Sequence, residues 1–336
     1  FRGDLQRTGA CITRAVYQIS DLKWKFRTGG WIAASPVIFD EKVYFGSLDG
    51  NLYVVDRERG KEKWRFKAGG SIYSSCAISE SKVFFGSLDG HFHVVDSATG
   101  WEKLRFRASG PIYSSPCVSH KTAYFGSVDG HLYALDFESG RIKWKFKTGG
   151  PVYSSPAIAE NMIFFGSLDS KLYGLDVETG KNMWTFTTGA MVSHAPAVSG
   201  HVVYVGSGDG VLYALDCQTG TEKWSFETDR KVSTSPALAF GLVFFGSEDG
   251  NVYAVSTKTG LQVWSVQTRG EVRAAPTVAR DVVYFGSRDG HLYASQARTG
   301  RVVWKYNTGK PIYSAPCIAD GTVFFGSDDG CLYAIR

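Results

Sequence analysis

Residues 113–146 read YSSPCVSHKTAYFGSVDGHLYALDFESGRIKWKF, and this stretch is most of a 40-residue unit that recurs along the chain. Its Phe-Gly-Ser-x-Asp-Gly element occurs eight times at a spacing of 40 residues, with substitutions at Val205 and Ser170. The copies begin at Phe45, Phe85, Phe125, Phe165, Val205, Phe245, Phe285 and Phe325. A period of about 40 residues with strand patterns is typical of propeller blades. The repeat therefore predicts a ring of eight blades.

Each unit contains four short segments with the composition of strands. Residues 152–158 and 163–167 are apolar runs, 132–136 is a third, and 143–147 (KWKFK) alternates polar and aromatic side chains. Asp-Gly between the second and third segments supplies the positive φ angles of a tight hairpin. We therefore expect an all-β fold of four-stranded antiparallel blades. Ser170 replaces the turn glycine in the fourth unit, so that hairpin is expected to be strained or of another type, and the loosest.

The repeat is out of phase at the two ends of the chain. Residues 23–27 form a fourth strand that precedes any first strand, whereas residues 312–335 supply three strands without a fourth. We expect the N-terminal strand to complete the eighth blade and to remove the open edge of the array. The chain is thus predicted to be a single domain over residues 1–336. Residues 1–20 carry no repeat and are expected to lie across one face of the ring.

Composition and residue spacing argue against a membrane-spanning helix and against a metal site. No run approaches the ~18 apolar residues of a membrane-spanning helix, so no transmembrane segment is predicted. The six cysteines show no C-x-x-C spacing, which predicts neither a zinc site nor a local disulfide. His91, His131 and His291 each follow an Asp-Gly turn without a third close ligand, so no metal site is predicted there.

Catalytic and nucleic-acid signatures are also missing from the sequence. It contains no Ser-His-Asp or Gly-rich phosphate pattern at a meaningful spacing, so no catalytic residue is predicted.

The chain begins at Phe1 without an initiator Met, which suggests a mature protein or an excised domain. The compartment stays open between an extracytoplasmic location, such as a bacterial periplasm, and the cytoplasm.

Residues 214–224 read ALDCQTGTEKW and fit the pattern A-x-D-x-x-T-G-x-x-x-W. This pattern resembles the tryptophan-docking motif of the pyrroloquinoline quinone (PQQ) repeat family, and the resemblance covers residues 24–336. Seven of the eight tryptophan positions are filled, whereas Leu104 occupies the eighth, with Trp101 three residues earlier, so a different packing is expected at that joint. The resemblance implies an eight-bladed propeller with tryptophans that pack between blades.

The resemblance is less specific for function. The family includes quinone-dependent alcohol and sugar dehydrogenases, an outer-membrane assembly lipoprotein that binds protein partners, and sensor domains attached to bacterial kinases or other enzymes. In the dehydrogenases, PQQ stacks on a tryptophan and in many cases against a disulfide of adjacent cysteines, and calcium is held by Glu, Asn and Asp. These groups come largely from insertions between blade strands. This chain has no adjacent cysteines and no insertions. No cofactor is therefore predicted, and PQQ with calcium is the alternative.

Differences between the repeats mark a candidate ligand site. The most variable stretch precedes the first strand of each blade, at the mouth of the central channel, and combines tyrosines with charged residues. A planar or anionic ligand would suit this combination through stacking and charge-assisted hydrogen bonds. The competing interpretation is that the tyrosines pack between blades and the charges solvate a rim. The candidate residues are Trp31, Tyr73, Tyr113, Tyr153, His194, Arg230, Lys231, Glu271, Arg273 and Tyr313.

A second difference concerns the fourth strands, which are basic on one half of the circumference. The net charge is +5, so an acidic protein, an anionic polymer or a membrane surface is a possible partner. The competing interpretation is that lysines on outer strands prevent edge-to-edge aggregation. No specific nucleic-acid signature is present. The basic residues are Lys23, Lys25, Lys63, Arg65, Lys67, Arg105, Lys143, Lys145 and Lys147.

Three hypotheses about function follow. The first is a non-catalytic propeller that binds a protein partner or a ligand, either as a monomer or as the recognition or sensor domain of a larger protein. The second is a PQQ-binding dehydrogenase of alcohols or sugars, with Trp31 as the stacking partner and Arg230, Lys231 and Arg273 near the carboxylates. The third is a purely structural ring without a partner.

Overall fold

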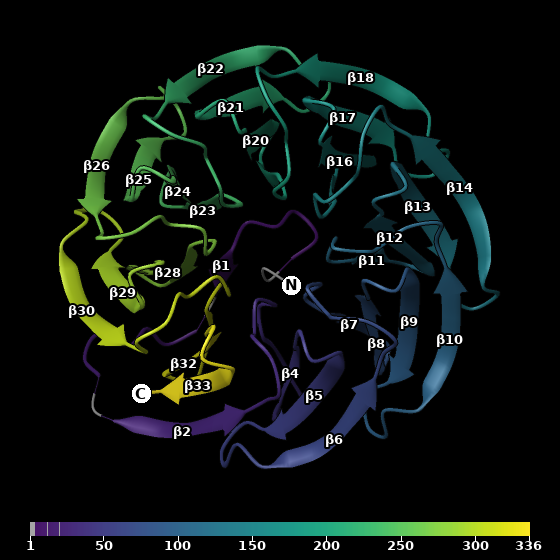
Figure 1. Cartoon of the computed structure of the whole chain (residues 1–336). Coiled ribbons are helices and arrows are strands. Elements are labelled where there is room, and N and C mark those ends of the chain that lie inside the picture. Colours follow the sequence, from purple (N-terminus) through teal and green to yellow (C-terminus); the bar gives the residue numbers. More distant parts are fainter. Residues whose placement is uncertain (1–3, 12, 20) are drawn as a thin grey trace.

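The computed structural model describes residues 4–11, 13–19 and 21–336, and within them all regular secondary structure is β-strand. The strands form eight sheets arranged as a closed ring around a central channel (Figure 1). In each blade the first strand faces the channel and the fourth lies on the outside (Figure 1). The predicted eight-bladed all-β propeller is therefore confirmed.

The strands of the blades have the following bounds. Blade 1 comprises β3 (Val37–Phe39), β4 (Lys42–Gly46), β5 (Asn51–Asp56) and β6 (Glu62–Lys67), and blade 2 comprises β7 (Ala77–Ser79), β8 (Lys82–Gly86), β9 (His91–Asp96) and β10 (Glu102–Arg107). Blade 3 comprises β11 (Cys117–Ser119), β12 (Thr122–Gly126), β13 (His131–Asp136) and β14 (Arg141–Lys147), and blade 4 comprises β15 (Ala157–Ala159), β16 (Met162–Ser167), β17 (Lys171–Asp176) and β18 (Asn182–Thr187). Blade 5 comprises β19 (Ala197–Ser199), β20 (Val202–Gly206), β21 (Val211–Asp216) and β22 (Glu222–Glu227), and blade 6 comprises β23 (Ala237–Ala239), β24 (Leu242–Gly246), β25 (Asn251–Ser256) and β26 (Gln262–Gln267). Blade 7 comprises β27 (Thr277–Ala279), β28 (Val282–Gly286), β29 (His291–Gln296) and β30 (Val302–Asn307), and blade 8 comprises β31 (Cys317–Ala319), β32 (Thr322–Gly326), β33 (Cys331–Ile335) and β2 (Leu22–Arg27).

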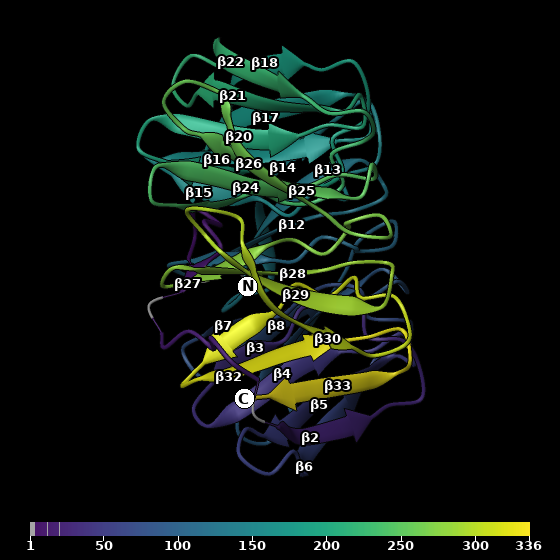
Figure 2. The same cartoon turned by 90° about the vertical axis from the view of Figure 1, so that its left-hand side faces the viewer.

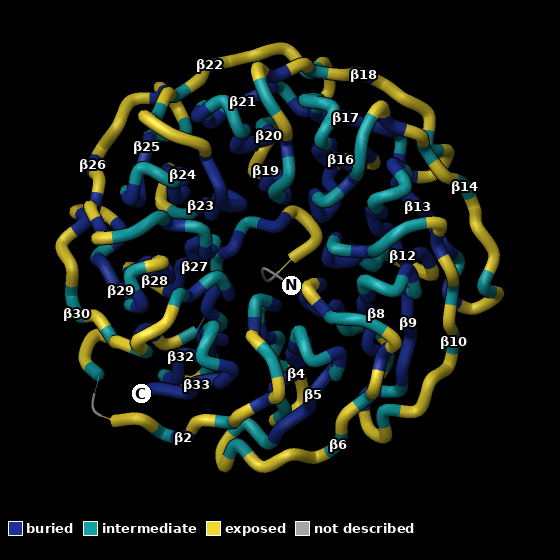
Figure 3. The backbone as a smooth tube through the Cα atoms, viewed as in Figure 1, coloured by how far each residue is buried: buried dark blue, intermediate teal, exposed yellow. Residues whose placement is uncertain are grey.

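The hydrophobic core lies between neighbouring blades. Phe125 of β12 stacks on its cross-strand partner Tyr133, with ring centroids 5.4 Å apart, and on Phe92 of the preceding blade at 4.1 Å. The second and third strands of each blade are thus covered on both faces, whereas the fourth strands alternate between half-buried and exposed residues (Figure 3). This difference explains why only the fourth strands show a clear polar and apolar alternation in the sequence.

Tryptophans of the fourth strands join each blade to the next. Six of them donate a hydrogen bond from Nε1 to a backbone carbonyl, over nitrogen–oxygen distances of 2.8–3.1 Å. The acceptor in five cases lies in the turn between the third and fourth strands of the next blade. The six donors are Trp24, Trp144, Trp184, Trp224, Trp264 and Trp304.

Two joints differ from this pattern. Trp64 packs over Gly100, but its Nε1 atom has no hydrogen-bond partner among the described residues. Leu104 takes the tryptophan position of blade 2, packs into the core beside blade 3 and has no side-chain donor. Trp101 does not substitute for it, because 76% of this residue is exposed. The different packing expected at Leu104 is therefore present.

The hairpin at Ser170 differs from the other seven, because Ser167 pairs with Lys171 and extends the ladder of β16 and β17 by one residue. Ser170 adopts φ = 68°, within the left-handed region in which glycine fits best. In the other blades the aspartate of the turn accepts a hydrogen bond from the amide two residues later, as Asp129 does from His131 at 2.9 Å. Among the described residues, Asp169 Oδ1 is buried without a partner. The turn is strained, as one of the two predicted alternatives stated.

Ser170→Gly is expected to stabilise the protein by about 1 kcal/mol, because it removes the left-handed strain and lets Asp169 resume the hydrogen bond of the turn. Thermal and denaturant unfolding of the variant and the parent chain measure the difference. The reciprocal change Gly130→Ser is the matched control and should destabilise the chain by a similar amount, since Gly130 has φ = 81°. Equal stability of the parent chain and both variants would contradict the assignment of strain.

The N-terminal strand closes the ring as predicted. β2 pairs antiparallel with β33, with Trp24 opposite Ala334 and Phe26 opposite Leu332. The third and fourth strands of blade 8 therefore come from opposite ends of the chain, and no turn connects them. Val16 fills the place of that turn, because its carbonyl accepts the Trp304 hydrogen bond at 2.8 Å. Val16 also exchanges backbone hydrogen bonds with the hydroxyl of Tyr284, at 2.7 and 3.2 Å.

The segment before Val16 lies across one end of the channel, inside the circle of first strands (Figures 1 and 2). It pairs with the first strands of four consecutive blades, one blade after another. β1 (Ala10–Cys11) is parallel to β27. The carbonyls of Leu5, Gln6, Thr8 and Gly9 accept hydrogen bonds from the amides of Ile158, Val198, Leu238 and Val278 at 2.7–2.9 Å. Residues 1–3, 12 and 20 of the predicted non-repeat segment lie outside the described residues.

The side chain of Arg7 anchors residues 4–11 to the blades. Its side chain is buried, and its guanidinium donates to the carbonyls of Ser115, Pro116 and Pro156 at 2.9–3.0 Å. Burial lowers the pKa of Arg7 from its usual value. The carbonyls supply the polar partners that a buried guanidinium needs. A cavity of about 370 Å³ lies beside this segment and is lined by it and by the first strands of several blades.

The two ends of the channel differ in their loops. We call the end that carries the Asp-Gly turns the upper face, which lies on the right in Figure 2. The opposite end, with the turns that follow the first and third strands, is the lower face, on the left in Figure 2. The described part of the chain contains no helix with the length and hydrophobicity needed to span a bilayer.

Candidate functional site

Two loops of every blade meet at the upper mouth of the channel. The loop before the first strand and the turn between the second and third strands are joined by a backbone hydrogen bond, as from Val128 N to Pro111 O at 2.9 Å. Each blade therefore contributes two variable positions to the mouth. The first position holds Ala33, Tyr73, Tyr113, Tyr153, Ser193, Ser233, Arg273 and Tyr313 around the ring. The second holds Leu48, Leu88, Val128, Leu168, Gly208, Glu248, Arg288 and Asp328.

Tyrosines of blades 2 to 4 form an arc at the first position. The ring centroids of Tyr73 and Tyr113 are 5.2 Å apart, and those of Tyr113 and Tyr153 are 4.7 Å apart. Burial raises the pKa of Tyr73 and Tyr113 above the usual value, so both are neutral phenols at physiological pH. The rings contact one another at interplanar angles of 46° and 32°, and Tyr73 stays 38% exposed.

Charged residues of blades 6 and 7 form an ion-pair cluster at another part of the mouth. Arg273 contacts Glu248 at 3.0 Å and Glu271 at 2.8 Å, and Arg288 donates to Glu271 at 2.8 Å. Ser233 also donates to Glu248, at 2.7 Å. The hydrogen bond from Arg288 holds the pKa of Glu271 below its usual value. Glu271 is therefore ionised, and both glutamates are already paired with arginines.

His194 lies beside this cluster but does not add to its charge. Burial, reinforced by the positive charge of Arg273, lowers the pKa of His194 to about 4. Its Nδ1 atom is 3.0 Å from Ser193 Oγ. At neutral pH the imidazole is therefore uncharged, and Arg273 and Arg288 supply the positive charges of the ion-pair cluster.

Asp328 is the one mouth carboxylate that is not held by an arginine in the described part of the chain. Its Oδ1 atom is buried and has no hydrogen-bond partner among the described residues. Burial raises the pKa of Asp328 to about 6, although the nearby Arg288 favours the charged form. The negative charge of Asp328 in turn helps to raise the pKa of Tyr73, after burial and the charge of Tyr113. Next to Asp328 the tyrosine arc is interrupted by Ala33, whose neighbour Ile32 donates to Ser327 O at 3.4 Å.

The structure brings together most, but not all, of the residues predicted for the mouth. The tyrosines, His194, Glu271 and Arg273 line it. Trp31 is 55% exposed, and Arg230 and Lys231 are exposed on the loop of blade 6. Arg230 lines a separate open depression of about 480 Å³, together with Arg269 and Glu271. In the described part of the chain, the side chains of Trp31, Arg230 and Lys231 have no ion pair or ring contact.

Comparison of the repeats did not predict three residues that line the mouth: Glu248, Arg288 and Asp328. Each is the x residue of Phe-Gly-Ser-x-Asp-Gly, which was interpreted only as a turn. A signal was present, because this position is apolar or glycine in blades 1 to 5 and charged in the consecutive blades 6 to 8.

The basic outer strands carry charges that are partly compensated locally. Lys23 pairs with Glu58 at 2.7 Å, and Lys63 pairs with Asp56 at 3.1 Å. Arg65 and Arg105 lie 3.1 and 3.8 Å from the glutamates three residues before them. Lys67 and Lys147 donate to the backbone carbonyls of Asp49 and Asp129 at 2.6 and 2.5 Å. Of the predicted basic residues, Lys25, Lys143 and Lys145 have no such partner among the described residues.

The closed ring of eight four-stranded blades defines an eight-bladed β-propeller with a polar upper mouth. A family model described as the beta-propeller of the beta-alanine-activating enzyme matches residues 11–202 and 161–336. These matches cover nearly the whole chain, and the chain belongs to this family. Comparison with curated protein sequences found no match.

Solved structures show the same fold. The designed protein Ika8 has a TM-score of 0.83 at 20% identity, over 92% of this chain and 97% of that one. BamB from Moraxella catarrhalis has a TM-score of 0.82 at 20% identity, over 94% and 99%. The quinohemoprotein alcohol dehydrogenase from Comamonas testosteroni has a TM-score of 0.87 at 15% identity, over 99% and 79%. At these identities the likeness concerns the fold alone.

Proposed function

We propose that the chain is a non-catalytic recognition domain of a β-alanine-activating enzyme, and that its upper mouth binds a small ligand with an ammonium group. The observation that carries the proposal is the buried, unpartnered Oδ1 atom of Asp328 beside the tyrosine arc. A buried carboxylate without a partner is costly, and a ligand that donates hydrogen bonds to it removes that cost.

The surroundings of Asp328 favour an amine over other donors. Tyr73 and Tyr313 flank Ala33 at the first position of the mouth. The charge of Asp328 helps to raise the pKa of Tyr73, and Tyr313 is close enough to Arg288 to help raise the pKa of that arginine. Aromatic faces combined with a carboxylate recognise cations through their quadrupoles and through charge-assisted hydrogen bonds. An ammonium ion therefore meets both attractions at this place.

The carboxylate end of an amino acid has a partner at the same mouth. Arg288 lies beside Asp328, and its guanidinium offers donors beyond the one that binds Glu271. β-Alanine has an ammonium and a carboxylate at its two ends, and the name of the family refers to an enzyme that activates this amino acid. We propose β-alanine, or a β-alanyl group on a larger molecule, as the ligand.

The titratable groups of the mouth favour binding over catalysis. Glu248 and Glu271 are neutralised by arginines, so neither is a free general base. His194 contacts Ser193, but no carboxylate orients its second ring nitrogen in the described part of the chain, as a nucleophile–base pair requires. The mouth can thus hold a ligand, whereas it lacks an activated nucleophile.

Asp328→Asn is expected to weaken β-alanine binding by at least ~10-fold, because the neutral amide loses the charge-assisted hydrogen bond to the ammonium group. Binding by the parent chain should strengthen between pH 5 and pH 7, as the carboxyl ionises above its raised pKa of about 6. Calorimetric titrations at several pH values measure both effects. Glu178→Gln is the matched control, an exposed carboxylate on the lower face that should leave binding unchanged.

Analogues separate the two ends of the ligand. Propylamine should retain part of the affinity and propionate should lose most of it, if the carboxylate–ammonium contact dominates. Binding of β-alanine that is unchanged in Asp328→Asn, or no saturable binding at all, would refute the proposed site.

The same titrations test the alternative functions. A calcium-bound PQQ needs about 6–8 oxygen ligands for the metal. The mouth carboxylates of blades 6 and 7 already bind arginines, so the residues present do not fit that cage. We propose that the domain uses no PQQ. Saturable PQQ binding with calcium, together with dye reduction by alcohols, would replace the proposed function by that of a quinoprotein dehydrogenase.

A protein partner on the basic outer strands is the second proposal for binding, with Lys25, Lys143 and Lys145 as the residues open to it. A pull-down repeated with these lysines changed to glutamine tests it. Absence of any partner and of any mouth ligand would leave the purely structural ring.

A further inference from the structure

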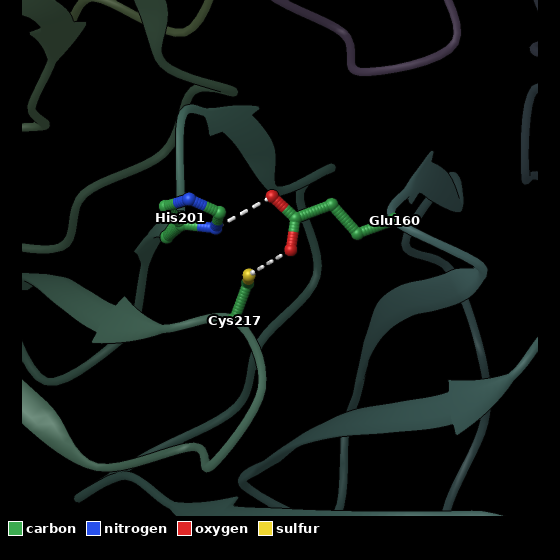
Figure 4. Close-up of side chains that lie close together, drawn as sticks. All are labelled: Glu160, His201 and Cys217. Carbon is green, nitrogen blue, oxygen red and sulfur yellow. Dashed lines mark hydrogen bonds and ion pairs between the residues drawn. The ribbon is translucent and has the colours of Figure 1, made fainter.

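Three side chains with metal-ligand atoms meet on the lower face, between blades 4 and 5 (Figure 4). Glu160 lies in the turn after β15, His201 lies in the same turn of blade 5, and Cys217 follows β21. Glu160 Oε1 is 2.7 Å from His201 Nδ1, and Cys217 Sγ donates to Glu160 Oε2 at 3.3 Å. The ligand atoms of all three residues lie within 4.8 Å of one another.

The backbone holds this group in place from both blades. The amide of Cys217 donates to His201 O at 3.0 Å, and its carbonyl accepts the Trp184 Nε1 hydrogen bond at 2.9 Å. Gln218 Nε2 donates to Glu160 Oε2 at 2.9 Å and orients the carboxylate. A metal site gains affinity when its ligands and their outer partners are positioned before the ion arrives.

The same three positions of the repeat also meet at another joint between blades, where they hold different residues. Four repeats away, between blades 8 and 1, the equivalent positions hold Asp320, Glu41 and Arg57. Arg57 contacts Glu41 at 2.6 Å and Asp320 at 2.7 Å, so a cation of the protein itself neutralises the two carboxylates. Between blades 4 and 5 the arginine position holds the thiol of Cys217. A carboxylate, an imidazole and a thiol therefore gather without a cation of the chain among them.

We propose that Glu160, His201 and Cys217 bind a zinc ion that joins blades 4 and 5. Zinc takes sulfur, nitrogen and oxygen ligands in this combination, whereas calcium and magnesium prefer oxygen alone. One Zn²⁺ ion with a thiolate and a carboxylate gives a site of zero net charge. The fourth position of the tetrahedron is left to water, because His201 is 76% exposed and the site opens to the solvent.

Binding of the ion displaces a proton. Burial and the hydrogen bond to Glu160 raise the pKa of the Cys217 thiol to about 12, so it is protonated in the metal-free protein at neutral pH. Hydrogen bonds from Gln218, Cys217 and His201 lower the pKa of Glu160, which is already a carboxylate. The thiol loses its proton to the solvent as the sulfur–zinc bond forms, and zinc affinity should therefore rise with pH.

The test is a zinc titration of the full chain after dialysis against a chelator. The parent protein is expected to bind one Zn²⁺ ion and to release about one proton per ion at neutral pH. Cys217→Ser and His201→Ala should each weaken binding by at least the ~10–100-fold that loss of an outer partner costs. With Co²⁺ as the probe, the sulfur-to-metal charge-transfer absorption should appear in the parent chain and vanish in Cys217→Ser.

His120→Ala is the matched control. His120 occupies in blade 3 the position that Glu160 has in blade 4, is exposed, and faces positions equivalent to His201 and Cys217 that hold Asn161 and Val177. This variant should bind zinc as the parent does. Circular dichroism of each variant establishes that it is folded. Absence of saturable zinc binding, or binding that survives Cys217→Ser unchanged, would overturn the proposal. The mouth ligand plays no part in this experiment.

Discussion

Removal of residues 1–27 is expected to abolish cooperative folding, a loss comparable with the whole ~5–15 kcal/mol that stabilises a typical domain. The deletion takes away the fourth strand of blade 8 and exposes the ladder of β33. It also removes the carbonyl of Val16 from Trp304 and the guanidinium of Arg7 from three carbonyls inside the channel. Circular dichroism, binding of a hydrophobic dye and light scattering would show an unfolded or aggregated chain.

A second chain separates the two parts of the N-terminal region. In it, residues 4–11 are replaced by a Gly-Ser segment of equal length, and residues 13–27 are kept. This chain should fold with reduced stability, because the ring is closed by β2 while the channel segment is lost. A folded ring in the chain that lacks residues 1–27 would contradict the closure.

Trp264→Ala is expected to destabilise the protein by ~3–5 kcal/mol, the usual cost of removing a large buried aromatic side chain. Trp264 is 7% exposed, packs over Gly300 of blade 7 and donates to Ala297 O at 2.9 Å. The substitution leaves a cavity between two blades and an unpaired carbonyl. Chemical denaturation measures the change if the transition is two-state.

Trp101→Ala is the control for this substitution. Trp101 is 76% exposed and should change stability by no more than ~0.5 kcal/mol, as is usual for surface positions. Similar effects of the two substitutions would show that the blades are not held together by their buried tryptophans.

Most of the fold could be predicted from the sequence because its instructions are local and repeated. The Asp-Gly turn and the fourth-strand tryptophan recur every 40 residues, and the offset between residues 23–27 and 312–335 identified the closing strand. The path of residues 4–11 could not be predicted, since a single arginine in a segment without periodicity is normally expected at the surface. Its burial depends on the carbonyls of Ser115, Pro116 and Pro156, which are remote in sequence.

The candidate sites followed from the sequence only in part. The tyrosine arc and Arg273 could be found because they sit at one position of the unit. Asp328 was missed because its position had been assigned to the turn, and its raised pKa arises from burial at the mouth, which the sequence does not express. Glu160 and Cys217 are 57 residues apart and belong to different turns of neighbouring blades. Spacing rules for metal ligands apply to residues close together in sequence, so they could not predict this contact.

Residues 4–11 also affect the number of blades that can close into a ring. Eight nearly identical units contain no local instruction to stop at eight, because any unit can pack against any other. Leu5, Gln6, Thr8 and Gly9 meet blades 4, 5, 6 and 7 in turn, so the segment follows an arc whose curvature is that of an eight-membered circle. In a seven- or nine-membered circle the successive amides would lie on a different radius, and these four hydrogen bonds and the Arg7 contacts would not form together. We therefore expect residues 4–11, which carry no repeat, to favour a ring of eight blades over rings of another size.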